Sequence, residues 1–183
     1  MTHSDGLSIE YERHGGVREL IDAVQYCLEG LSLDFGAHDD PHVKGPGAYL
    51  AVVSGRRIAN HAARYRWPVE ESTVPLSDLD TFYTTLSEVA LTRDGAVVLS
   101  VDGVVQERMV RFRDRPEPGT EYADWMGSRH MSALDTSRRD SVVATLTLSQ
   151  ETGRVTLFRD GGFESVERER IAARWRSEDD QSV

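Results

Sequence analysis

One hairpin signal constrains the fold of this chain more than any other stretch. Residues 96–100 form a short apolar run, and residues 104–112 form a longer one. Between them stands Asp102-Gly103, a dipeptide that favours the tight turn of a β-hairpin. Because the two strands of a hairpin are antiparallel, the sequence predicts a sheet that contains at least one antiparallel pair.

Further along the chain lies a long β-branched run. Residues 141–148 read Ser-Val-Val-Ala-Thr-Leu-Thr-Leu, a composition that predicts a central strand. A turn at 151–153 and an apolar run over 154–158 predict that this strand continues into another hairpin. Residues 48–53 are predicted to form a further buried strand.

Helical periodicity separates these strands. Apolar residues recur at three- and four-residue spacing over 16–31 and 77–90, with Ser77 as the expected cap of the second helix and Asp80 in its first turn. A short helix is also expected around 166–175. We therefore expect an α/β fold, a single domain with a central mixed β-sheet flanked by helices.

At 183 residues the chain has the length of one domain. We expect a partly flexible N-terminus over 1–15, the folded domain over 16–165 and a charged tail over 166–183 that is partly helical and then disordered. No run of eighteen apolar residues is present, so no membrane span is expected. The first residues carry no signal pattern and Cys27 is the single cysteine, which favours the reducing cytoplasm.

The charge of the chain bears on its partners. The net charge is −10, and Lys44 is the only lysine among 21 lysine and arginine residues. An acidic, lysine-poor surface is typical of proteins from halophiles, so we expect a halophilic host. Concentrated salt weakens non-specific phosphate contacts steeply, which argues against nucleic-acid binding and requires any phosphate ligand to be enclosed.

The stretch from Gly127 to Leu134 carries the clearest chemistry. Gly127 allows close backbone approach, Ser128 is the expected N-cap of a helical run over 131–134, and a helix start attracts anions. Arg129 adds a planar fork for phosphate oxygens, and His130 adds a further donor. A short helical piece is expected just before, over 122–126. By itself the motif is equally compatible with a phosphate site and with a surface turn followed by a capped helix.

Two other short motifs change this interpretation. Asp94-Gly95-Ala96 lies upstream, and Ser149-Gln150-Glu151-Thr152-Gly153 lies downstream. With Arg129-His130 they resemble, in order and over roughly residues 75–163, the diadenylate cyclase family (the DisA N-terminal domain), of an archaeal type. The resemblance implies a mixed sheet flanked by helices. The implied activity is condensation of two ATP into cyclic di-AMP and two pyrophosphates.

The resemblance also implies roles for individual residues. Asp94 would be catalytic, would bind a divalent metal (Mg²⁺ or Mn²⁺) together with Glu151, and would lie near the attacking 3′-hydroxyl. The residues implied in substrate binding are Gly95, Ala96, Gly127, Ser128, Arg129, His130 and Ser149. Since each subunit would carry one ATP, a homodimer or higher homo-oligomer is required, which suits a product with two equal bonds.

Two departures from the family pattern leave alternatives open. Met131 replaces the last arginine of Arg-His-Arg, and Arg138 and Arg139 are candidates for supplying the missing charge. Gln150 replaces an acidic residue. The chain is thus interpreted as an active diadenylate cyclase, with a catalytically silent relative that binds a nucleotide or cyclic dinucleotide as one alternative. A metal-dependent phosphodiesterase is the other alternative.

Overall fold

The computed structural model of the chain describes residues 14–34, 46–54, 62–63, 72–73, 78–91, 95–113 and 116–179. In chain order these residues form α1 (Gly15–Asp34), β1 (Ala48–Val53), β2 (Ala62–Ala63), β3 (Ser72–Thr73), α2 (Leu79–Leu91), β4 (Ala96–Ser100), β5 (Val104–Phe112), α3 (Ser128–Thr136), β6 (Val142–Leu148), β7 (Val155–Arg159), β8 (Gly162–Val166) and α4 (Arg168–Asp179).

The strands that the structure describes join in one mixed sheet. Their order is β2-β5-β4-β1-β6-β7-β8, and β3 pairs with β5. Only the pairing of β1 with β4 is parallel among these strands, while β1 runs antiparallel to β6. The β4–β5 and β6–β7 hairpins are both present. The predicted α/β fold with a mixed sheet is therefore confirmed.

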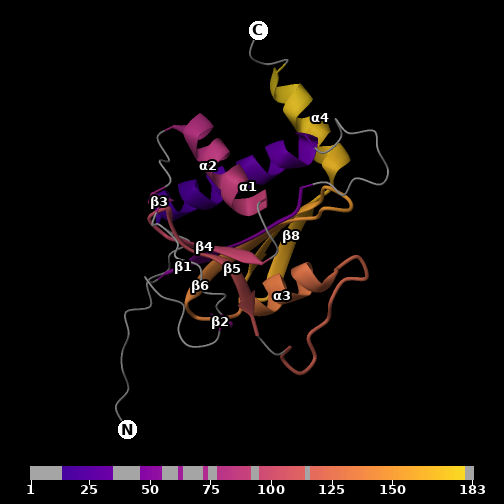
Figure 1. The fold of residues 1–183 in the computed structure, drawn as a ribbon. Helices are drawn as coiled ribbons and strands as arrows, with labels where there is room; N and C mark the ends of the chain where they lie inside the picture. Colours follow the sequence, from indigo (N-terminus) through magenta and orange to yellow (C-terminus); the bar gives the residue numbers. More distant parts are fainter. Residues whose placement is uncertain are drawn as a thin grey trace.

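Helices cover both faces of this sheet (Figure 1). α1, α2 and α4 lie on one face, and α3 lies on the other. Side chains of β1 point to the two faces of the sheet. Leu50 and Val52 pack in the core under α1, whereas Tyr49 and Val53 belong to the core on the α3 side. The predicted apolar face of α1 is buried as expected, at Val17, Leu20, Ile21, Val24, Cys27, Leu28 and Leu31.

The start of α2 differs from the prediction. The Asp78 carboxylate accepts a hydrogen bond from the Thr81 backbone N–H at 3.1 Å, so Asp78 is the cap. Ser77, the expected cap, lies outside the described residues. Leu79 belongs to the predicted apolar face but is 51% exposed, because it occupies the first turn before the helix reaches the core at Phe82.

The end of the chain contains a strand that the sequence did not indicate. β8 pairs antiparallel with β7 and forms a sheet edge that is largely exposed. α4 follows and packs on α1, with Ile171 buried. Glu29 of α1, only 4% exposed, forms an ion pair with Arg174 and accepts a hydrogen bond from Trp175 Nε1 at 3.1 Å.

Residues 122–126 form a turn and not the expected helical piece. The Met126 N–H donates to the Ala123 carbonyl at 2.9 Å, and no helix continues from it. The Tyr122 hydroxyl donates to the Asp135 carboxylate at 2.9 Å, which ties this segment to α3. This hydrogen bond attaches the segment before α3 to the helix itself. No helix among the described residues is both long and apolar enough to cross a membrane.

Candidate nucleotide site

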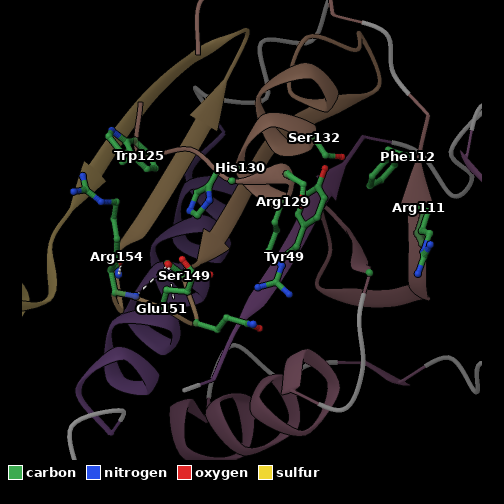
Figure 2. A pocket seen from close by; sticks show the side chains of 16 residues that line it. Tyr49, Arg111, Phe112, Trp125, Arg129, His130, Ser132, Ser149, Glu151 and Arg154 are labelled. Carbon is green, nitrogen blue, oxygen red and sulfur yellow. Dashed lines mark hydrogen bonds between the residues drawn. The ribbon is translucent and has the colours of Figure 1, made fainter. Parts of the chain in front are cut away.

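A cavity of about 580 Å³ opens beside the start of α3, a size within the usual range of small-molecule pockets. It lies on the α3 side of the sheet (Figure 2). Its lining comes from β1, β5, α3 and the segments around them: Tyr49, Gly95, Val110, Arg111, Phe112, Trp125, Gly127, Ser128, Arg129, His130, Ser132, Ser149, Gln150, Glu151, Thr152 and Arg154.

The charge of this lining is opposite in sign to that of the whole chain. Among the described residues, the charged side chains on the lining are those of Arg111, Arg129 and Arg154 and the carboxylate of Glu151. The chain as a whole carries −10. A positive cavity in an acidic protein favours the binding of an anionic ligand at this place on the surface.

The first turn of α3 contributes backbone donors. The helix begins at Ser128, and its N-cap is Gly127 in an extended conformation (φ −85°, ψ −179°). The expectation that Ser128 is the cap is wrong, since no side-chain hydrogen bond caps this helix and Ser128 is already helical. The first helical bond joins the Met131 N–H to the Gly127 carbonyl at 3.0 Å. The three N–H groups before Met131 therefore have no acceptor within the helix, which suits an anion.

The turn between β6 and β7 is organised by Ser149. Its hydroxyl oxygen accepts hydrogen bonds from the backbone N–H groups of Glu151 (3.4 Å) and Thr152 (3.3 Å). Since both bonds use the oxygen as acceptor, the hydroxyl hydrogen remains available for a ligand. Gly153 completes the turn at φ +69°, where a Cβ atom would also come within 2.9 Å of Ser32 Oγ.

A glycine that the sequence did not single out lies against the Arg129 side chain. A Cβ atom on Gly47 would stand 2.5 Å from Arg129 Nη1 and 3.0 Å from Gln150 Oε1. Gly47 therefore leaves the room in which the guanidinium and the Gln150 side chain lie. This contact joins the start of β1 to the first turn of α3 and to the Ser149 turn.

His130 is a neutral group in this setting. Its side chain is 6% exposed, and its ring meets the Trp125 ring edge-on at 5.1 Å. Burial, and then the charges of Arg129 and Arg154, lower the pKa of His130 to about 4. Its Nε2 atom has no hydrogen-bond partner among the described residues. At neutral pH His130 can thus donate from one nitrogen only.

Aromatic side chains form the opposite part of the lining. The rings of Tyr49 and Phe112 are 5.8 Å apart and tilted, and Val110 lies beside them. Figure 2 shows Arg111 and Phe112 at the right of the view, Ser149, Glu151 and Arg154 at the left, and Tyr49 between them in the centre. Planar apolar walls of this kind suit a flat ring. The sequence pointed to the region of residues 110–112 without assigning a residue, and it missed Tyr49.

Most of the residues implied by the family motifs gather at this cavity. Gly95, Gly127, Ser128, Arg129, His130, Ser149 and Glu151 all line it. Ala96 does not, because its side chain is fully buried in the core on the α3 side. Asp94 lies outside the described residues, although Gly95, which follows it, is on the lining.

Met131 lies away from the cavity. Met131 packs against the apolar cluster on the α3 side of the sheet and does not line the cavity. Neither candidate for replacing its charge lies there: Arg138 pairs with Asp135 at 3.6 Å, and the Arg139 guanidinium lies over the Phe112 ring at 5.1 Å from its centre. The cations that join Arg129 on the lining are Arg111 and Arg154.

The donor set fits a divalent metal only in combination with a ligand. Hard cations such as Mg²⁺ prefer oxygen donors, and Glu151 is the one carboxylate that the described part of the chain brings to the lining. No group of three or more histidine, cysteine, aspartate and glutamate residues within the described ranges could hold an ion by itself. These residues suit a metal that is carried largely by phosphate oxygens.

The fold and the cavity together define an α/β domain with a positively charged pocket on the α3 side of its sheet. Residues 74–163 match the family model described as DisA bacterial checkpoint controller nucleotide-binding. This segment is just under half of the chain's length, and the match agrees with the resemblance seen in its motifs.

The fold is also similar to that of solved structures. A hypothetical membrane spanning protein from Bacillus cereus shares 17% identity at a TM-score of 0.55, with 84% of this chain and 64% of that chain covered. This chain therefore spans less than two thirds of that structure, and the likeness concerns the fold alone. A double mutant of DacA from Staphylococcus aureus shares 16% identity at a TM-score of 0.48, with 84% and 88% covered. No curated protein matches.

Proposed function

We propose that this chain is a diadenylate cyclase, which condenses two ATP into cyclic di-AMP and releases two pyrophosphates. The observation that carries the proposal is the positive cavity, where Arg129, the first turn of α3 and the Ser149 turn meet. The match of residues 74–163 to the family model supports the same reaction class. The archaeal and halophilic origin remains a prediction.

The two parts of the cavity suit the two parts of ATP. In the proposed complex the triphosphate lies at the start of α3, held by the Arg129 guanidinium, the backbone N–H groups of the first turn and the Ser149 hydroxyl. The adenine ring lies near Tyr49 and Phe112, whose rings form the apolar part of the lining. Neutral His130 adds a hydrogen bond without adding charge.

The proposed reaction is an in-line displacement at phosphorus. The 3′-hydroxyl of one ATP gives up its proton to a base beside it, and its oxygen attacks the α-phosphorus of the other ATP. The bond to the bridging oxygen breaks, and pyrophosphate leaves. Positive charge around the triphosphate stabilises the departing pyrophosphate, and this is the role of Arg129. Asp94 would stand beside the attacking hydroxyl. A divalent ion, held by Asp94 and Glu151, would neutralise phosphate charge when bound.

Two copies of the chain are required by this chemistry. One cavity holds one ATP, and each of the two new bonds joins atoms from different ATP molecules. A face-to-face homodimer brings the 3′-hydroxyl in one cavity to the α-phosphate in the other, and its two-fold axis makes the two bonds equivalent. An isolated subunit is therefore expected to be inactive.

The proposal is tested by separating binding from turnover. Asp94→Asn is expected to abolish formation of cyclic di-AMP while ATP still binds, because it removes a metal ligand with little change in bulk. Arg129→Gln is expected to weaken ATP binding by roughly ten- to one-hundred-fold. Arg170→Gln, an exposed change on α4, serves as the control. Full activity in Asp94→Asn would show that the assignment is wrong.

One observation favours a second candidate, a silent relative that binds a nucleotide without turning it over. The arginine that the family motif places at position 131 is replaced by a methionine packed against apolar neighbours. A protein that binds ATP or cyclic di-AMP and yields no product under any condition would be this relative.

A further inference from the structure

Arg154 occupies a position on the cavity that no family motif assigns. It follows the Ser149–Gly153 turn directly, and its backbone is held in that turn: its N–H donates to Thr152 Oγ1 at 3.4 Å, and its carbonyl accepts from the Ser149 N–H at 2.9 Å. The Arg154 side chain therefore extends from the same turn that carries the Ser149 hydroxyl.

The side chain of Arg154 is held on three sides. Its guanidinium lies over the Trp125 ring, with 4.4 Å between the central carbon and the ring centre. Nη1 donates to Ser165 Oγ at 3.1 Å, and Nη2 donates to Glu167 Oε1 at 2.6 Å. The side chain is 19% exposed. A guanidinium fixed on a ring face and by two hydrogen bonds loses little further freedom when it binds a ligand.

The hydrogen bonds to Ser165 and Glu167 leave further donors on this guanidinium. An arginine has five N–H donors in a plane, and these two bonds occupy one each on Nη1 and Nη2. The ring face of Trp125 covers one side of the plane, and the N–H donors lie along the edge of that plane. Phosphate oxygens bind along such an edge.

Arg154 also lies close to the other phosphate-binding groups. Figure 2 shows it on the same side as His130, Ser149 and Glu151. The Trp125 ring that supports Arg154 also contacts the His130 ring, at 5.1 Å between ring centres. In keeping with this, the positive charge of Arg154 contributes to the lowered pKa of His130.

We propose that Arg154 is the second phosphate-binding arginine of the cavity and supplies, from the start of β7, the positive charge that Met131 does not. This inference rests on the proposed nucleotide function and assigns a residue to it. Trp125 supports the guanidinium, and Glu167 and Ser165 orient it from the β8 edge. The second positive charge of the cavity is thus carried by a residue next to the sheet and not by a residue of α3.

The test compares a ligand that carries the triphosphate with one that does not. The probes are 3′-deoxyATP with Mg²⁺, which lacks the attacking hydroxyl and so cannot turn over, and adenosine, and both are measured by calorimetry. Arg154→Gln is expected to weaken 3′-deoxyATP binding by roughly ten- to one-hundred-fold and to leave adenosine binding within about two-fold. Arg154→Lys is expected to give an intermediate loss, since lysine keeps the charge but not the planar fork.

Controls separate the possible failures. Arg170→Gln should bind both probes as the wild type does, and Arg129→Gln should lose affinity for 3′-deoxyATP. If Arg129→Gln weakens binding and Arg154→Gln and Arg154→Lys do not, the inference about Arg154 is wrong and the proposed function stands. Equal losses for both probes would show a merely structural role. A wild-type protein that binds neither probe would overturn the proposed function itself.

Discussion

The buried, neutral state of His130 predicts a specific loss of stability in mild acid. A histidine of unfolded chains titrates near pH 6.5, whereas burial and two arginines lower the pKa of His130 to about 4. The unfolded chain therefore takes up a proton first. The stability that neutral His130 contributes is fully present above pH 6.5 and is lost as the pH falls from 6.5 towards 4.

The size of the loss follows from these two pKa values. Between pH 7.5 and pH 5.5 they give about 1.3 kcal/mol, and we expect about 1 kcal/mol after allowance for partial solvent screening. The measurement is urea unfolding of the wild type and His130→Gln at both pH values. The wild type should lose about 1 kcal/mol more than the variant.

A matched control is available at the start of α1. His14 is exposed and lies outside the buried cluster, so His14→Gln serves as the control for the loss of a histidine side chain. Equal losses in wild type and His130→Gln would refute the reasoning, because they would mean that His130 takes up its proton in the folded protein as easily as in the unfolded chain.

Three further predictions concern packing. Met131→Arg should lower the free energy of unfolding by about 1–3 kcal/mol without tightening ATP binding, because it places a charge in an apolar cluster, whereas Met131→Leu should be nearly neutral. Gly95→Ala should lower the free energy of unfolding by about 3 kcal/mol, since at φ +113° a Cβ atom would stand 2.7 Å from the Met109 backbone. Gly119→Ala is the matched control: at φ +83° in open space it should lower the free energy of unfolding by only about 1 kcal/mol. Glu29→Ala should cost about 2 kcal/mol and expose α4 to proteolysis, because Arg174 loses its buried partner. Denaturant unfolding measures the first two, and limited proteolysis adds the third.

The periodic parts of the sequence predicted the fold well. The all-apolar run of β1, the hairpin at Asp102-Gly103 and the apolar stripe of α1 each occur where the pattern placed them. These patterns report the burial of apolar side chains, which is the dominant driving force of folding, so they can be recognised without knowledge of neighbours.

Features that depend on local geometry or on contacts in the folded chain, such as helix caps and edge strands, were predicted poorly. Both helix starts were misassigned by one residue, because several adjacent polar residues can cap and only the local geometry selects one. β8 was missed because an exposed edge strand that starts with a glycine has no apolar alternation to show.

The sequence motifs predicted part of the candidate site, and the residues outside these motifs were missed. The motif residues Arg129 and Ser149 both line the cavity, as do Tyr49 of β1 and Arg154 just before β7, which no motif marks. Gly47, just before β1, lies against the Arg129 side chain. No local pattern marks such residues. Only the sheet order, which places β1 between β4 and β6, brings them to one cavity.

The most direct test of the central claim is product formation by the purified chain. ATP is incubated with the protein and Mg²⁺ or Mn²⁺ at low and high salt. The products are separated by chromatography and identified by mass spectrometry. We expect cyclic di-AMP that depends on metal, with two pyrophosphates released for each molecule formed. No product in any salt while ATP still binds, or consumption of added cyclic di-AMP, would contradict the account.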